Sequence, residues 1–193
     1  MRNNNQSIPS PSFVKEGEQN KMQGYKFSPV RSKKELFNTI EYLHVTCNEL
    51  CKLTFGRYLP PAGNIGIFCH FEDEFKFLTS LCEELTDRNE NWNQKYYRLH
   101  EPIIVSSKGD IPRAVYTYLY IRKPDPDKPE VGDIDFVLED KRFAELKNFL
   151  HDNSNINDVD IFYRPDLDMF RLSSPDYDVL PYITTTTMKE KGI

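Results

Sequence analysis

The chain has 193 residues, of which 25 are Lys or Arg and 30 are Asp or Glu, so its net charge is −5. This length allows one domain with tails or two small domains. The acidic balance argues against general nucleic-acid binding, which needs a basic face, and an aromatic content of 13% supplies apolar surface for a folded core.

The sequence contains no apolar run long enough to span a bilayer. Its first residues lack the apolar segment of a secretory signal. The four cysteines, at positions 47, 51, 69 and 82, are too few for a disulfide scaffold in a chain of this length. We therefore expect reduced thiols and a soluble, cytoplasmic protein that does not contact membranes.

Polar residues and prolines dominate the beginning of the chain. We expect residues 1–30 to form a disordered basic arm, because they carry too little apolar surface to offset the entropy of ordering. A single domain is then expected over residues 31–183, followed by a frayed tail over residues 184–193. The sequence leaves open whether the arm docks on the domain.

Three segments show the apolar spacing of amphipathic helices. The strongest covers residues 32–55, where Ser32 and Glu35 fit a capping box and apolar side chains recur in steps of four and three. Gly56 then supplies a stop signal. Two further helices are expected at 72–86 and 140–151.

Segments rich in β-branched and aromatic residues predict the strands. They lie at 63–70, 96–105, 115–122, 133–138, 158–163, 168–172 and 178–183. The resulting order is α-β-α-β-β-β-α-β-β-β, in which helices and strands do not alternate regularly. This order predicts the α+β class, as a single compact domain with a mixed, mostly antiparallel sheet.

Charge is distributed unevenly along the chain. Residues 1–57 hold nine basic and five acidic residues, whereas residues 58–193 hold 16 and 25. A basic arm is therefore attached to an acidic body, which attracts cations or a basic partner. This pattern favours a binding or interaction protein, whose partner is a protein or small-molecule ligand that the sequence does not identify. Ordinary solvation of a charged tail is the alternative.

The segment GDIDFVLE, residues 132–139, contains two carboxylates at alternate strand positions. Asp133 and Asp135 are therefore expected on one side of the sheet, where they can share a divalent cation. The segment resembles the acidic strand of the nucleotidyltransferase superfamily, in which an Asp-x-Asp pair binds metal and a later strand supplies a third carboxylate. The resemblance implies Asp133, Asp135 and Asp160 as metal ligands, with Mg²⁺ or Mn²⁺ as cofactor and nucleotidyl or phosphoryl transfer as the reaction.

The Gly-Ser turn that precedes the acidic strand in that superfamily is missing from this chain. Arg122 and Lys123 lie upstream instead and are the expected phosphate or ligand contacts. Solvated or capping Asp side chains at a strand edge are the alternative interpretation of the acidic segment.

The predicted element order also resembles the paired βαβββ modules of the vicinal-oxygen-chelate proteins, which include glyoxalases and extradiol dioxygenases. Those proteins place His and Glu side chains from module strands around one metal. The resemblance implies a small-molecule metalloenzyme in which His70 and Glu139 lie near the relevant strand ends.

Tyrosines alternate along the predicted strand at 115–122. Tyr116, Tyr118 and Tyr120 form a candidate surface for stacking against bases or other planar ligands, although tyrosine is also an ordinary half-exposed strand residue. No catalytic residue is assigned by the sequence. Three function classes remain open: a binding or interaction protein, a divalent-metal transferase, and a paired-module metalloenzyme.

Overall fold

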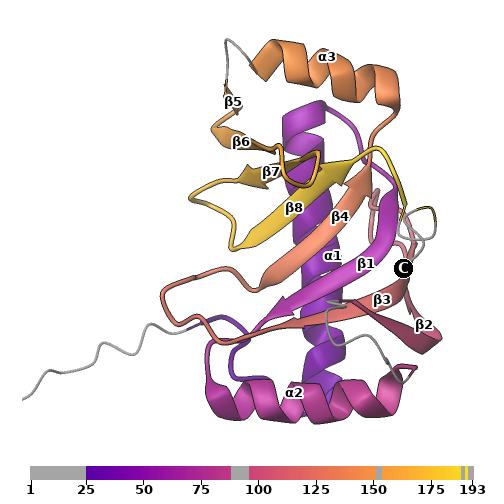
Figure 1. Cartoon of the computed structure of the whole chain (residues 1–193), viewed down its shortest axis with the longest axis vertical. Helices are drawn as coiled ribbons and strands as arrows, with labels where there is room; N and C mark the ends of the chain where they lie inside the picture. Colours follow the sequence, from indigo (N-terminus) through magenta and orange to yellow (C-terminus); the bar gives the residue numbers. More distant parts are fainter. Residues whose placement is uncertain (1–24, 88–95, 151–153, 188–189, 191–193) are drawn as a thin grey trace, which may run out of the picture.

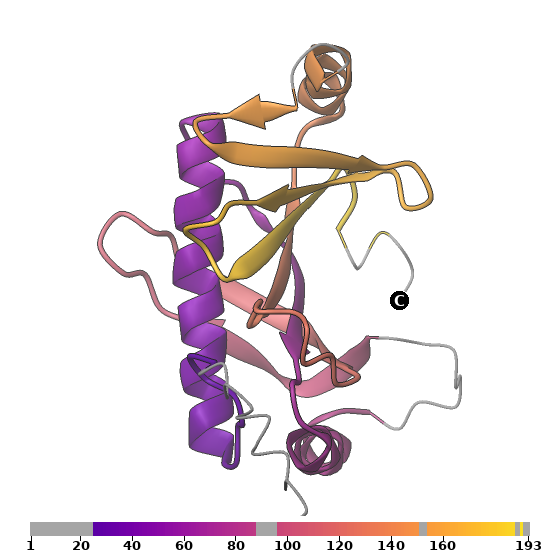
Figure 2. The ribbon, with the colours of Figure 1, turned by 90° about the vertical axis from the view of Figure 1, so that its left-hand side faces the viewer.

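One sheet forms the centre of the structure, and a long helix lies across one of its faces (Figures 1 and 2). The computed structural model describes residues 25–87, 96–150, 154–187 and 190, and within these ranges the sheet has eight strands. The strands are β1 (Pro61–Phe68), β2 (Tyr97–Val105), β3 (Ala114–Arg122), β4 (Gly132–Val137), β5 (Asn155–Ile156), β6 (Val159–Arg164), β7 (Met169–Ser173) and β8 (Val179–Thr184). The helices are α1 (Lys33–Phe55), α2 (Glu72–Leu85) and α3 (Asp140–Leu150).

Two structural units follow one another along the chain and join in the middle of the sheet, whose strand order is β2-β3-β1-β4-β8-β7-β6-β5. In the first unit β1 pairs in parallel with β3, and in the second β4 pairs in parallel with β8. The units join where β1 and β4 run antiparallel. The predicted α+β class with a mixed, mostly antiparallel sheet is therefore confirmed, and the two-residue β5 is an addition to the predicted order.

The helix α1 begins after the N-cap residue Ser32, at the place that the sequence predicts. Ser32 Oγ accepts a hydrogen bond from the Glu35 N–H at 3.2 Å, and the Glu35 carboxylate accepts one from the Arg31 N–H at 2.6 Å. The helix ends at Gly56, which has a φ of 70°. The predicted apolar stripe is fully buried: Leu36, Ile40, Leu43, Cys47 and Leu50. Neither α1 nor any other described helix has the length and hydrophobicity of a membrane span.

Residues 25–31 pack on the body of the domain. Val30 is 2% exposed and belongs to the core. The buried carboxylate of Glu74 accepts hydrogen bonds from the Val30 N–H at 2.8 Å and the His70 N–H at 2.9 Å. Tyr25 stacks on the His70 ring, with the ring centroids 3.7 Å apart.

Residues 25–30 therefore pack on the domain, which answers for this segment the question of docking that the sequence leaves open. Their apolar contacts and buried hydrogen bonds offset the entropy of ordering. Residues 1–24 and, in the predicted tail, residues 188–189 and 191–193 lie outside the described residues.

The alternation of side chains along β4 assigns the two faces of the sheet. Ile134 and Phe136 are fully buried in the core on the side of α1. Asp133 and Asp135 therefore point to the opposite face. Among the described helices, α1 runs along one side of the sheet while α2 and α3 lie at its two ends (Figure 2). This arrangement leaves the middle of the opposite face open for a site.

Candidate functional site

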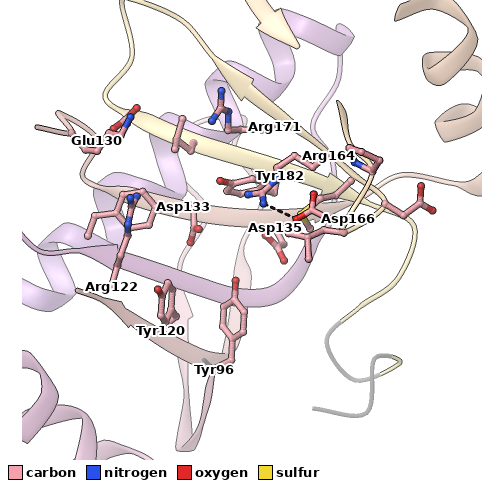
Figure 3. A pocket seen from close by; sticks show the side chains of 17 residues that line it. Tyr96, Tyr120, Arg122, Glu130, Asp133, Asp135, Arg164, Asp166, Arg171 and Tyr182 are labelled. Carbon is pink, nitrogen blue, oxygen red and sulfur yellow. Dashed lines mark hydrogen bonds and ion pairs between the residues drawn. The ribbon is translucent and has the colours of Figure 1, made fainter. Parts of the chain in front are cut away.

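A cavity of about 800 Å³ lies on the face of the sheet opposite α1 (Figure 3). Both structural units contribute to it, because β3 belongs to the first unit and β4, β6, β7 and β8 belong to the second. Its polar lining residues are Tyr96, Tyr120, Arg122, Lys128, Glu130, Asp133, Asp135, Arg164, Asp166, Asp168, Arg171 and Tyr182. We call this space the Asp133 cavity.

Asp133 lies in the wall of the cavity with only 6% of its surface exposed. Its Oδ1 atom has no hydrogen-bond partner among the described residues. Burial raises the pKa of Asp133 to about 8, and the neighbouring charge of Asp135 adds to this effect, whereas Arg122 opposes it. The carboxyl group therefore holds its proton at neutral pH.

Asp135 is also buried and occupies the next cavity-facing position on β4. Across the sheet, Asp135 pairs in register with Tyr182 of β8, which pairs with Arg171 of β7. Directly opposed residues on neighbouring strands project to the same face. The cavity wall therefore contains a row of a carboxylate, a phenol and a guanidinium group.

Three arginines surround the two carboxylates (Figure 3). Arg122 forms an ion pair with Asp125 at 3.1 Å and lies over the ring of Phe68. Arg164 forms an ion pair with Asp166 at 2.8 Å. These pairs hold the guanidinium groups of Arg122 and Arg164 at fixed places beside the cavity.

Tyrosines form a further part of the wall. The rings of Tyr96 and Tyr120 lie 5.5 Å apart between centroids. Burial raises the pKa of Tyr182, and Asp133 adds to this effect, while Arg171 and Arg164 oppose it. All three phenols therefore remain neutral hydrogen-bonding groups at physiological pH.

The arrangement combines acid–base groups with oxyanion-binding groups. A neutral carboxyl group can donate a proton to a bound molecule and take it back, provided that its pKa lies near the working pH. Guanidinium groups bind carboxylate or phosphate oxygens through paired hydrogen bonds.

The structure brings together only two of the three predicted metal ligands. Asp133 and Asp135 line the cavity, but Asp160 is exposed on β6 and accepts a hydrogen bond from Asn155 at 2.9 Å. Asp160 is separated from the pair because β8 and β7 lie between β4 and β6. Within the described part of the chain, no group of three His, Cys, Asp or Glu residues is placed to hold a metal ion.

The structure also separates the two expected phosphate or ligand contacts, Arg122 and Lys123. Arg122 lines the cavity, whereas Lys123 is exposed and Lys128 occupies the lining in its place. Side chains alternate along β3, and the chain leaves the strand directly after Arg122, so the two neighbours do not share a site.

The structure buries two of the three tyrosines of the predicted stacking surface. Tyr116 is fully buried, and its hydroxyl lies 2.9 Å from His44 Nδ1 on α1. Tyr118 is also buried, and only Tyr120 lines the cavity. For Tyr116 the covering element is α1, which carries His44.

His70 and Glu139, the pair suggested by the vicinal-oxygen-chelate resemblance, are not brought together. Each follows the C-terminal end of a strand, β1 and β4 respectively, and these two strands run antiparallel. The two residues therefore lie toward opposite ends of the sheet, and neither lines the Asp133 cavity.

Sequence reasoning missed Tyr182, Glu130 and Lys128 as lining residues. The residues around each of them in the sequence form no motif that indicates a shared site. Tyr182 reaches the cavity only because β8, the last of the described strands, inserts beside β4.

The fold and the cavity together define a class of protein: an α+β domain of two joined units with a polar cavity of small-molecule size on one face of its sheet. No known protein family and no curated protein matches the sequence.

Solved structures resemble the chain at low sequence identity. Structural-genomics protein EC4020 is similar with a TM-score of 0.51 and 14% identity, over 80% of this chain and 90% of that one. At this identity the likeness shows the fold alone. Methylmalonyl-CoA epimerase of Streptomyces coelicolor has a TM-score of 0.32 with 19% identity, over 68% of this chain and 98% of that one. A methylmalonyl-CoA epimerase in complex with methylmalonyl-CoA and NH4+ has a TM-score of 0.31 with 17% identity over the same shares. These two scores support no inference about this chain.

Proposed function

We propose that this chain binds a small polar molecule in the Asp133 cavity and that Asp133 exchanges a proton with that molecule. The observation that carries the proposal is the position of the Asp133 carboxyl group. It is buried in the cavity wall beside a second carboxylate, and its Oδ1 atom has no hydrogen-bond partner among the described residues. Burying a polar atom without a partner is unfavourable, so a ligand that supplies the partner gains affinity.

The size and lining of the cavity support a small-molecule ligand. Ligand pockets commonly enclose roughly 300–1,000 Å³ and combine apolar walls with a few placed polar groups. The volume of about 800 Å³ falls in this range. Phe68, Met169 and Leu180 supply apolar wall between the charged residues.

A mixture screen by ligand-observed NMR tests the binding half of the proposal. The full chain is screened at neutral pH against small polar metabolites. Leu167 lines the cavity and is 54% exposed. Leu167→Trp should therefore reduce the volume of the cavity without disturbing the packing of the core. Leu53, which is 40% exposed on α1 outside the cavity, gives the matched control Leu53→Trp. Compounds that use the cavity should bind the wild type and Leu53→Trp but lose affinity for Leu167→Trp. A screen without any such compound would contradict the proposal.

Calorimetry tests the proton-exchange half. Binding of a hit is measured in two buffers with different ionisation enthalpies, which reports the number of protons taken up or released. The wild type should exchange a fraction of a proton between pH 7 and 9, and Asp133→Asn should not. If the wild type and Asp133→Asn exchanged the same number of protons on binding, Asp133 would not be the group that exchanges a proton with the ligand.

A second candidate function is divalent-metal-dependent phosphoryl or nucleotidyl transfer. It is favoured by the placement of Asp133 and Asp135 in one cavity, because one or two carboxylates can hold Mg²⁺ when substrate phosphates complete its coordination. Mg²⁺ or Mn²⁺, added together with inorganic phosphate, should then raise the melting temperature, and Asp135→Asn should abolish the rise. Asp160→Asn is the matched control outside the cavity. A melting temperature that does not respond to either ion would exclude this candidate.

A further inference from the structure

Arg171 differs from the other arginines of the Asp133 cavity. Its guanidinium group lies 5.3 Å from the ring centroid of Phe162, and its Nε atom has no hydrogen-bond partner among the described residues. Arg122 and Arg164 are engaged by Asp125 and Asp166. No described carboxylate forms such an ion pair with Arg171. Its positive charge and its planar set of N–H donors are therefore available to a ligand.

The side chain is also held in place. Arg171 is half-buried on the central part of β7, and its stacking on Phe162 orients the planar group. A fixed guanidinium group loses less conformational entropy when it binds than a mobile surface lysine does. Lys128, the other lining cation without a described ion pair, is exposed on a loop. Arg171 is thus the better prepared of the two to bind an anion.

The sheet register sets the distance between this cation and the carboxylates. Arg171, Tyr182 and Asp135 lie side by side on β7, β8 and β4. Two strand spacings separate the first from the last, which corresponds to about 10 Å between their backbones. A ligand that reaches from Arg171 to the two carboxyl groups of β4 therefore has its charged group on one side and its other end beside Asp133 and Asp135, with Tyr182 beneath its middle.

We propose that the molecule bound in the Asp133 cavity carries an oxyanion, a phosphate ester or a carboxylate, which binds to Arg171, while an uncharged part of the molecule lies against Asp133. This inference rests on the proposed function, because it requires that the cavity binds a ligand. It adds the chemical class of the ligand and its orientation. The uncharged part belongs beside Asp133 because an anion there would lie in a buried site next to the second acidic side chain of β4, Asp135.

Four aromatic probes of similar size test whether the site prefers an oxyanion to a neutral group: phenyl phosphate, benzoate, phenol and benzyl alcohol. Their affinities for the full chain are measured by NMR titration at constant ionic strength. The two anions should bind at least tenfold more tightly than the two neutral compounds, because hydrogen bonds to a charged group are roughly twice as strong as those between neutral groups. The comparison of phenyl phosphate with benzoate shows which oxyanion the site prefers.

Substitutions identify the binding residue. Arg171→Gln should weaken anion binding about tenfold or more and leave the neutral probes unchanged. Arg171→Lys keeps the charge but loses the paired donors, so we expect an intermediate loss. Arg142→Gln, an exposed change on α3 that removes only the pair with Glu145, is the control and should have no effect. The melting temperature of each variant verifies that it is folded.

The outcomes distinguish this inference from the proposed function. If neutral probes bind as tightly as anions and Leu167→Trp weakens both, the cavity binds ligands but the oxyanion inference is wrong. If anions bind and Arg171→Gln has no effect, Arg171 does not hold them and the inference is also wrong. If no compound of the metabolite screen or of this set is sensitive to Leu167→Trp, the proposed function itself fails.

Discussion

The carboxyl group of Asp133 occupies the space that a side chain on Gly66 would fill. The two residues are directly paired across the antiparallel strands β1 and β4. A Cβ atom on Gly66 would lie 2.0 Å from Asp133 Oδ1, which is far inside van der Waals contact. Glycine at position 66 is therefore what allows a carboxyl group to be placed inside this wall of the cavity.

We predict that Gly66→Ala destabilises the protein by about 1–3 kcal/mol, because the new methyl group displaces the Asp133 carboxyl group. The cost should largely disappear in an Asp133→Ala background, where the clashing atoms are absent. A double-mutant cycle in urea measures the coupling between the two positions.

Gly132→Ala is the control for this cycle. A Cβ atom on Gly132 would lie 2.1 Å from the Gly66 carbonyl oxygen, a backbone atom that Asp133→Ala does not remove. Gly132→Ala should therefore be equally destabilising in both backgrounds. Additive effects of Gly66→Ala and Asp133→Ala would show that the close approach does not constrain the carboxyl group.

The raised pKa of Asp133 predicts a loss of stability as the pH rises. The pKa moves from the ordinary value of 3.8 to about 8 in the folded protein, so the folded state binds this proton more tightly than the unfolded state does. The stability gained by keeping Asp133 neutral is fully present below about pH 4 and is lost as the pH rises toward 8.

Asp133→Asn should remove this dependence, since the amide is neutral at every pH. The difference in unfolding free energy between variant and wild type should grow by at most about 1.4 kcal/mol per pH unit and level off above pH 8. Urea denaturation at pH 5, 7 and 9 measures it. Parallel stability curves for the two proteins would contradict the assigned pKa.

The predictable parts of this fold are the ones encoded by local patterns. The helix α1 follows from Ser32, Glu35 and a stripe with helical spacing, all of which lie within one segment of sequence. Asp133 and Asp135 could be placed on one face because alternation along a strand is also local. Both features are found in the structure.

The parts of the site that were not predicted depend on strand order. The nucleotidyltransferase resemblance implies Asp160 as the third acid beside the pair, but β7 and β8 lie between β6 and β4. The same insertion brings Arg171 and Tyr182 beside Asp135. Pairings between residues distant in sequence leave no trace in local composition, so a single sequence does not reveal them.

The burial of Tyr116 predicts a structural role for this residue. His44 Nε2 lies 3.0 Å from the Pro112 carbonyl oxygen and donates to it, so His44 Nδ1 accepts a hydrogen bond from the Tyr116 hydroxyl. Tyr116→Phe leaves this buried nitrogen with only the long contact to Asn48 at 3.3 Å. We expect a loss of about 1–3 kcal/mol in unfolding free energy.

Tyr120→Phe is the matched variant on the same strand. Tyr120 is half-buried at the cavity, and removal of its hydroxyl should change stability by less than about 0.5 kcal/mol. The probe affinities should show the reverse pattern, with an effect of Tyr120→Phe and none of Tyr116→Phe. If Tyr116→Phe and Tyr120→Phe changed the probe affinities by similar amounts, Tyr116 would take part in ligand binding and its assignment as a structural residue would be wrong.

The buried carboxylate of Glu74 predicts that residues 25–31 contribute to stability. Glu74 is 1% exposed, and its two oxygens accept hydrogen bonds from the backbone N–H groups of Val30 and His70 and from the Ser28 hydroxyl. In Glu74→Gln the amide NH₂ must face one of these backbone donors in either orientation, so at least one buried N–H loses its acceptor.

We expect Glu74→Gln to lower the unfolding free energy by about 2–3 kcal/mol, as measured by urea denaturation at neutral pH. Asp73→Asn in the same helical turn is the control, because it removes only an exposed contact with Arg31 at 3.9 Å and should change stability by less than about 0.5 kcal/mol. Equal effects of the two substitutions would show that Glu74 does not hold the N-terminal segment, and that residues 25–31 can leave the body of the domain at little free-energy cost.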